Sequence, residues 1–291
     1  MSASKYEQGV GFDRSPTPDQ IAEARVQLDT LFLNFEGLVQ EFSSAFELKN
    51  IGQTFATDDL ALKPYLLTTE VQFALSSCID HLQTLRNLTV CDLIPNLAAY
   101  TLVRSAIEHA SLAMWYLDPE DPDERRRRVL VQSATGATLL AKALEDIGVS
   151  GTPSLETKLG KISEKAVSLG LEPVSQAEIK RSSIKDRVRW SGVVLQGLGV
   201  GSEGSNLIST VWQSASGIAH ANSSAGLMLL NRRALVDHEE TKSTTFHIST
   251  SEVEVARLFQ LSIYLLETVL HLVKFREGLE ADKYPSFSKG P

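Results

Sequence analysis

The stretch TLVRSAIEHASLAMWYL, residues 101–117, carries ionisable side chains inside an otherwise apolar run. Arg104, Glu108 and His109 are residue types that stabilise charge on a phosphate, orient a neighbouring group and transfer protons. On a helix advancing about 100° per residue, Arg104 and Glu108 lie about 40° apart, whereas His109 lies about 140° from Arg104. We therefore expect Arg104 and Glu108 to touch, either as a structural ion pair or as part of a site.

A second candidate lies in SASGIAHAN, residues 214–222, where His220 follows Ser216 by four positions. Residues four apart share a helix face, so the Ser216 hydroxyl and the His220 imidazole can serve one site. The small residues between and beside them would let another backbone or a ligand approach closely: Ala215, Gly217, Ala219 and Ala221. The alternative is a core histidine satisfied by a buried hydrogen-bond network.

The six residues RSAIEH place an arginine, a polar residue, three further residues and a histidine in order. This spacing resembles the motif of HEPN ribonucleases, a superfamily of helical toxins and antiviral effectors. The resemblance implies metal-independent RNA cleavage at a site shared by two protomers, and hence a homodimer. Histidine would assist attack of the ribose 2′-hydroxyl, and arginine would stabilise the charge on the phosphate.

A longer resemblance joins LVRSAIEHASLAMWYLDPEDPDERRRR to the later segment VWQSASGIAHANSS. The pair resembles HEPN-like bacterial helical proteins that combine an Arg-x-x-x-Glu helix with a Ser-x-x-x-His segment. It implies that Arg104 and Glu108 face Ser216 and His220 in a polar cluster inside the bundle. The corresponding function is a metal-independent endoribonuclease of the toxin or phage-defence type, with His109 or His220 as acid/base. The alternative is a noncatalytic binding or scaffold protein that keeps the Arg/Glu/His network for stability.

The net charge of −8, from 36 acidic and 28 basic side chains, argues against a broad nucleic-acid surface. Contact with RNA must then be local, at the run 125–128 or in the segment KRSSIKDRVRW, residues 180–190. The candidate RNA contacts in that segment are Lys180, Arg181, Lys185, Arg187 and Arg189. The alternative for both places is a solvated helix face, since Asp121, Asp123 and Glu124 offer neutralising neighbours to the first.

The sequence contains no pattern typical of a bound metal or cofactor. Cys78 and Cys91 lack CxxC spacing, the remaining histidines are scattered, and no Glu-x-x-His pair or Walker loop occurs. Two cysteines fit a reducing compartment, and the first thirty residues lack a signal-peptide pattern, so we expect a cytoplasmic protein. The most apolar segment, residues 255–275, is interrupted by charged residues and is not expected to span a membrane.

Apolar periodicity and capping signals predict an all-α multi-helix bundle with short inserted helices, and allow for one small β-hairpin within residues 227–249. Helices are expected at residues 17–48, 64–87, 94–117, 122–147, 154–169, 175–190, from 206 onward, and 251–279. An irregular connection is expected at 50–63 and a glycine-rich loop from Gly192 to Gly204. The expected organisation is a flexible leader (1–16), one helical domain (17–280) and a tail (281–291).

Overall fold

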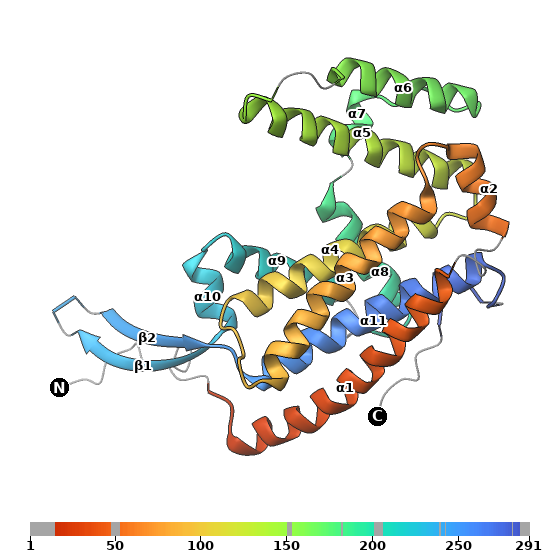
Figure 1. Cartoon of the computed structure of the whole chain (residues 1–291). Coiled ribbons are helices and arrows are strands. Elements are labelled where there is room, and N and C mark those ends of the chain that lie inside the picture. The colour runs from red at the N-terminus through yellow and green to blue at the C-terminus, as the bar shows by residue number, and fades with distance from the viewer. Residues whose placement is uncertain are drawn as a thin grey trace. The chain divides into compact units, whose positions relative to one another are not determined.

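The computed structural model describes residues 15–47, 53–149, 153–181, 183–200, 206–238, 240–241, 243–280 and 282–285. Over these ranges the chain forms eleven α-helices and one two-stranded antiparallel sheet (Figure 1). The prediction of an all-α multi-helix fold is therefore confirmed. Most of the expected leader and tail lies outside the described residues.

The bounds of the elements agree with most of the expected helices. In chain order they are α1 (Pro18–Ala45), α2 (Gln53–Leu62), α3 (Leu67–Val90), α4 (Ala98–Leu117), α5 (Pro122–Asp146), α6 (Leu155–Ser168), α7 (Gln176–Arg181), α8 (Ile184–Gly197), α9 (Leu207–Ala219), α10 (Ser223–Leu229), β1 (Asn231–His238), β2 (Ser243–Ser249) and α11 (Glu252–Arg276).

The chain divides into two compact units, each assembled from three stretches of sequence. The first unit comprises Met1–Gly37, Ile79–Ala106 and Thr210–Ile263, and the second comprises Leu38–Cys78, Ile107–Ser209 and Tyr264–Pro291. Helices α1, α3, α4, α9 and α11 contribute residues to both units. No single point of the sequence therefore separates the units, and the expected single domain over 17–280 stays a prediction.

The first unit has an aromatic core between the first part of α1 and the first part of α11. The ring of Phe259 packs edge-on against Phe32 at 5.1 Å and against Phe35 at 5.5 Å between centroids. At the edge of this contact, Arg25 pairs with Glu252 at 2.7 Å. The apolar stripes predicted for the two helices thus meet within the unit, as amphipathic helices require.

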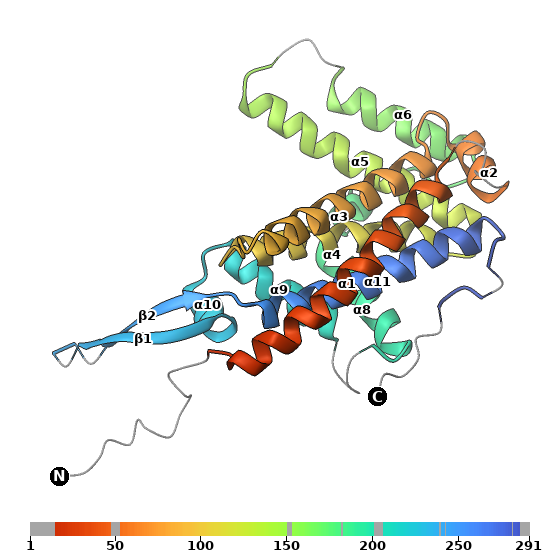
Figure 2. The ribbon, with the colours of Figure 1, turned by 60° about the horizontal axis from the view of Figure 1, so that its bottom comes forward.

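The first unit also contains the hairpin β1–β2, which extends away from the neighbouring helix α10 (Figures 1 and 2). Its antiparallel register pairs Asn231 with Ser249 and shifts by one residue between Ala234 and Val236. The predicted hairpin is confirmed. Its first three expected residues, 227–229, belong instead to α10, which Asn222 caps by accepting bonds from the amides of Ser224 and Ala225.

In the second unit, two arginines satisfy the carbonyl groups that follow the end of α4. Arg276 donates to the carbonyls of Leu117, Asp118 and Pro119, each at 2.8 Å. Arg125 donates to the carbonyl of Pro119 at 3.0 Å and to that of Glu120 at 2.8 Å. These bonds stabilise the partial negative charge at a helix C-terminus and hold the turn into α5.

Three sequence expectations about the second unit are wrong. Residues 53–62 form the helix α2, because Phe55, Asp58 and Leu62 bury their side chains. The single helix expected over 175–190 is two helices, since Ser183 accepts the amide of Asp186 and starts α8 as a new helix. Helix α8 then runs through Gly192 to Gly197, so neither glycine lies in a loop.

Helix α11 is the one helix in the described part of the chain that is long and apolar enough to cross a membrane. Its most apolar window is 67% buried inside the protein, as in the core helix of a soluble protein. The helix also carries Glu252, Glu254, Lys274 and Arg276 in its first and last turns. Most of the apolar side chains in this window therefore pack inside the protein.

Candidate functional site

The predicted residues on α4 are all partly accessible. Arg104, Ser105, Glu108 and His109 are each half-buried. The Arg104 guanidinium lies over the ring of Trp212 on α9, with 6.0 Å between the guanidinium carbon and the ring centroid. A cation over an indole face gains electrostatic attraction from the ring quadrupole, so this contact links α4 to α9 in the first unit.

The second predicted segment ends at the surface. Ser216 is half-buried on α9, and His220 directly follows the helix and is exposed. The His220 amide still donates to the Ser216 carbonyl at 3.0 Å, which continues the helical pattern. The expectation that the His220 side chain lies in a polar cluster inside the bundle is therefore wrong, because this side chain is exposed to solvent.

The small residues beside His220 accommodate a neighbouring helix of the same chain. A Cβ atom added to Gly217 would lie 2.8 Å from the Cβ atom of Ala225 on α10. The predicted catalytic residues divide between the two units: Arg104, Ser216 and His220 belong to the first, and Glu108 and His109 to the second.

The basic residues of the segment 180–190 have different environments. Lys180, Arg181, Lys185 and Arg189 are exposed, as a solvated helix face would have them. Arg187, by contrast, is only 6% exposed, so the interpretation as a solvated face is wrong for this residue. The buried guanidinium is held within the second unit by hydrogen bonding from its Nη2 atom to Oε1 of Gln132 on α5, at 2.6 Å.

The run 125–128 also differs from a simple solvated face. Arg125 is 5% exposed and pairs with Asp58, and Arg126 pairs with both Asp58 and Asp123. Arg128 pairs with Glu124 at 2.8 Å. The neutralising role expected of Asp123 and Glu124 is confirmed, whereas the partner Asp58 was not identified from the sequence.

Arg128 and Arg187 come together in one pocket of the second unit, with a volume of about 260 Å³. We call it the arginine–tryptophan pocket. Its lining comes from α4, α5, the end of α7 and the start of α8 and comprises Trp115, Arg128, Arg181, Ser183, Asp186, Arg187 and Trp190. The two basic segments of the sequence thus meet at a single concave site.

The centre of the pocket is one indole ring contacted by two cations. The guanidinium carbon of Arg187 lies 4.4 Å from the ring centroid of Trp115, and that of Arg128 lies 5.0 Å from it. Arg128 is fixed further by donating from Nη1 to the Trp115 carbonyl at 2.5 Å. A guanidinium that lies over an indole ring can still donate to an anion through those N–H groups at its own edge that are not already hydrogen-bonded.

The electrostatics of the pocket favour a negative ligand. Burial lowers the pKa of Arg187; the Tyr116 hydroxyl acts in the opposite direction, and the nearby charge of Arg128 lowers it further. Desolvation and like charge both disfavour the protonated guanidinium, so a bound anion would relieve a cost that the folded protein already bears. Arg181, the third arginine of the pocket, is exposed and can meet a ligand at the rim.

One carboxylate and one hydroxyl also line the rim. Ser183 donates from Oγ to Oδ2 of Asp186 at 2.6 Å and accepts the Asp186 amide at 3.1 Å. The Asp186 charge is thereby partly engaged in capping α8. Asp186 in the lining and Glu124, which pairs with Arg128, offset two of the three arginine charges, so the pocket keeps one net positive charge. The half-buried Trp190 adds an aromatic surface.

Sequence reasoning identified Arg181 and Arg187, and it identified Arg128 as part of the run 125–128, but it did not identify Trp115 as their partner. The basic character of both segments was visible in the sequence, whereas their convergence depends on how α5 and α8 pack around the end of α4. A tryptophan next to a basic segment, as in Arg189-Trp190, was the available signal for an aromatic component.

The neighbouring arginine, Arg127, makes a pH-sensitive contact between α5 and α7. Its Nη2 atom donates to both carboxylate oxygens of Glu178 at 2.6 Å. Burial of the Glu178 carboxyl raises its pKa, but hydrogen bonds from Arg127 and Ser175 outweigh burial and lower the pKa to about 2. A depressed folded-state pKa means that this contact stabilises the protein above the ordinary value of 4.5 and is lost as the pH falls toward 2.

We therefore expect Glu178→Gln to flatten the acid limb of the stability curve. Wild-type protein should lose part of its free energy of unfolding between pH 4.5 and about 2, and the variant should lose less over that window. Urea unfolding at a series of pH values measures the difference. Parallel curves for the two proteins would contradict the assignment.

No group of three or more histidine, cysteine, aspartate or glutamate side chains is placed to hold a metal ion in the described ranges. Cys78 is buried and Cys91 is exposed, and both are free thiols. The chain matches no known protein family, no curated protein and no solved structure. A functional assignment must therefore rest on the chemistry of its own residues.

Proposed function

We propose that this protein binds single-stranded RNA and that the arginine–tryptophan pocket holds one phosphate and an adjacent base. The observation that carries the proposal is the stacking of Arg128 and Arg187 on Trp115 inside a concave site. Single strands are commonly held by positive grooves that contact the backbone and by aromatic rings on which unpaired bases stack. Arg181 and Trp190 supply both elements at the rim.

The overall charge of the chain restricts the mode of binding. A protein with a net charge of −8 does not attract nucleic acid over its whole surface, so affinity must come from one local positive site. The resemblance to HEPN ribonucleases favours RNA over DNA. The proposed location is the cytoplasm, because the two cysteines are free thiols, as in proteins of a reducing compartment.

A comparison of two arginine variants distinguishes RNA binding at the pocket from a purely structural role of its arginines. Arg181, the last residue of α7, and Arg189, within α8, are both exposed, yet only Arg181 lines the pocket. Arg181→Gln and Arg189→Gln therefore make the same charge change inside and outside the site. Fluorescence anisotropy of a labelled single-stranded RNA should show weaker binding for Arg181→Gln alone, with a salt dependence reduced by about one unit of slope.

Replacing the aromatic surface should have the larger effect on affinity. Loss of one stacked base costs about 1–3 kcal/mol, which is roughly 5- to 150-fold in the dissociation constant. Trp190→Ala should weaken RNA binding by that factor while circular dichroism shows an unchanged helical signal. Equal losses from Arg181→Gln and Arg189→Gln, or no saturable binding by wild-type protein, would contradict the proposal.

A second candidate function, metal-independent endoribonuclease activity, is favoured by the residues of the first unit. Arg104 is anchored over Trp212, and α9 carries Ser216 and ends at the exposed His220. An exposed imidazole can act as acid or base on a bound ribose, and a homodimer would supply the shared site that HEPN ribonucleases use. Incubating the same RNA with protein in EDTA, with His109→Ala and His220→Ala as controls, separates cleavage from binding alone.

A further inference from the structure

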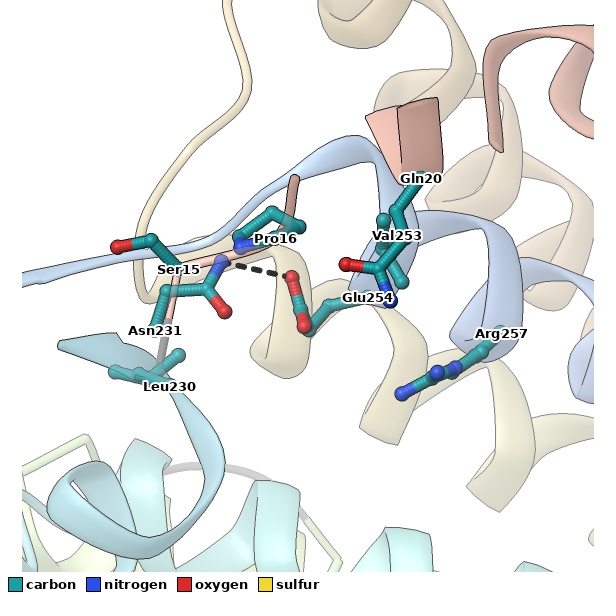
Figure 3. Close-up of a pocket in the computed structure, with 8 residues that line it drawn as sticks. All are labelled: Ser15, Pro16, Gln20, Leu230, Asn231, Val253, Glu254 and Arg257. Carbon is teal, nitrogen blue, oxygen red and sulfur yellow. Dashed lines mark hydrogen bonds between the residues drawn. The ribbon is translucent and has the colours of Figure 1, made fainter. Parts of the chain in front are cut away.

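A second cavity, with a volume of about 280 Å³, lies wholly within the first unit (Figure 3). It is bordered by the start of α1, the start of β1 and the first turns of α11. Its polar lining includes Gln20, Asn231, Glu254 and Arg257. Its apolar lining comprises the half-buried Val253 and Leu230, which is 1% exposed. None of these residues belongs to the sites discussed above.

The Glu254 carboxylate is fixed through only one of its oxygens. Oε2 accepts from Nδ2 of Asn231 at 2.9 Å, from the amide of Ser251 at 3.1 Å and from the Ser251 hydroxyl. In the described part of the chain, Oε1 accepts no hydrogen bond. Because the Asn231 amide nitrogen is engaged by Glu254, its Oδ1 atom remains as an acceptor beside the carboxylate (Figure 3).

The opposite side of the cavity carries hydrogen-bond donors. Gln20 accepts the Thr17 amide through Oε1 at 2.9 Å, which fixes its side chain and leaves its Nε2 donor available. Arg257 is exposed and extends from α11 as a second donor group (Figure 3). The cavity therefore has an acceptor half, formed by Glu254 and Asn231, and a donor half, formed by Gln20 and Arg257.

Glu254 and Arg257 are three residues apart on α11, a spacing at which opposite charges commonly pair. Among the described residues, however, no ion pair within 4.0 Å joins them, although both side chains line the same cavity. Burial raises the pKa of the Tyr100 hydroxyl. The charges of Glu254 and Arg257 also act on this pKa: Glu254 raises it and Arg257 lowers it. The two charges thus face a common space without neutralising each other directly.

We propose that this cavity binds a free α-amino acid with an aliphatic side chain. The ammonium group donates to Oε1 of Glu254 and to Oδ1 of Asn231, and the carboxylate accepts from Arg257 and from Nε2 of Gln20. The aliphatic side chain lies against Leu230 and Val253. Charge-assisted hydrogen bonds at both ends of one small zwitterion account for the separated charges of the site.

The chemistry of the cavity disfavours other small ligands. A phosphate or dicarboxylate would meet the fixed Glu254 carboxylate, and a simple amine would leave Arg257 without a counter-charge. The volume is also below the range of about 300–1,000 Å³ typical of sites for larger ligands, which fits a single amino acid.

The test uses ligands that differ by one charged group. Leucine, isoleucine, valine and methionine are each titrated into the full-length protein by calorimetry, together with 3-methylbutylamine and 4-methylpentanoate. The last two are leucine without its carboxylate and without its amine. We expect saturable binding of at least one amino acid at one site per chain, and at least about tenfold weaker binding of both leucine analogues if leucine binds.

A protein variant tests the location of the site. Arg257→Gln removes the charge that meets the carboxylate, and the exposed position makes correct folding straightforward to verify by circular dichroism. The variant should bind the amino acid at least about tenfold more weakly, whereas Arg189→Gln, a matched change in the second unit, should bind as wild type does. Absence of saturable binding by wild-type protein, or unchanged affinity in Arg257→Gln, would overturn the proposal.

Discussion

Asp58→Ala is expected to lower the free energy of unfolding by about 3–5 kcal/mol. The Asp58 carboxylate is fully buried and pairs with two guanidiniums, at 2.8 Å from Nη2 of Arg125 and at 2.8 Å from Nε of Arg126. Removing it leaves Arg125, itself only 5% exposed, with a positive charge that lacks its carboxylate partner. The remaining bonds from Arg125 to the carbonyls of Pro119 and Glu120 do not neutralise that charge.

Asp123→Ala provides the control for this prediction. Asp123 also pairs with Arg126, at 3.1 Å, but its side chain is 53% exposed. Exposed ion pairs contribute about 0–1 kcal/mol, so this variant should unfold close to wild type in urea. Similar losses from Asp58→Ala and Asp123→Ala would show that burial of the Asp58 pair has little energetic consequence.

Gly217→Ala should destabilise the protein, by up to about 2 kcal/mol, although alanine is the better helix former. The added Cβ atom would lie 2.8 Å from that of Ala225, closer than two carbon atoms can pack. Overpacking of this kind costs about 1–3 kcal/mol, and the gain in helix propensity, about 1 kcal/mol, offsets only part of it. Thermal and urea unfolding measure the net change.

Gly136→Ala makes the same substitution where space is available. Gly136 lies within α5, and no atom lies within 4 Å of the position that a Cβ atom would occupy. This variant should be more stable than wild type by about 0.5–1 kcal/mol. The two substitutions should therefore change stability with opposite signs, and two stabilised variants would show that α9 and α10 are less closely packed than the structure has them.

Local signals predicted the helix starts well because their physics is local. The Thr17–Gln20 capping box forms, with the Thr17 amide donating to Gln20 at 2.9 Å. Asp121 caps α5 ahead of Pro122, and Ser175 exchanges hydrogen bonds with Glu178. Each motif involves side chains and amides within three residues of one another, so the sequence alone contains the whole interaction.

The wrong helix predictions concern segments whose local helix preference is weak and whose conformation is determined by burial of their side chains. The segment 53–62 has little amphipathic pattern, yet it is helical because Phe55 and Leu62 are buried and Asp58 meets two arginines distant in sequence. The same reasoning explains Gly192, which lies inside α8 although glycine is unfavourable there, because it is buried against Asn206, whose Oδ1 atom would lie 1.9 Å from an added Cβ atom. Tertiary packing overrode propensity in both places.

By itself, the sequence determined the all-α class, most helix positions and the hairpin, and it supplied candidate site residues, because periodicity, capping and side-chain type are properties of short segments. Only the tertiary structure brought Arg128 and Arg187 onto Trp115, separated Glu254 from Arg257 across a cavity and placed His220 at the surface. These features depend on contacts between residues distant in the chain, and their geometry follows from helix packing, which a linear pattern does not encode.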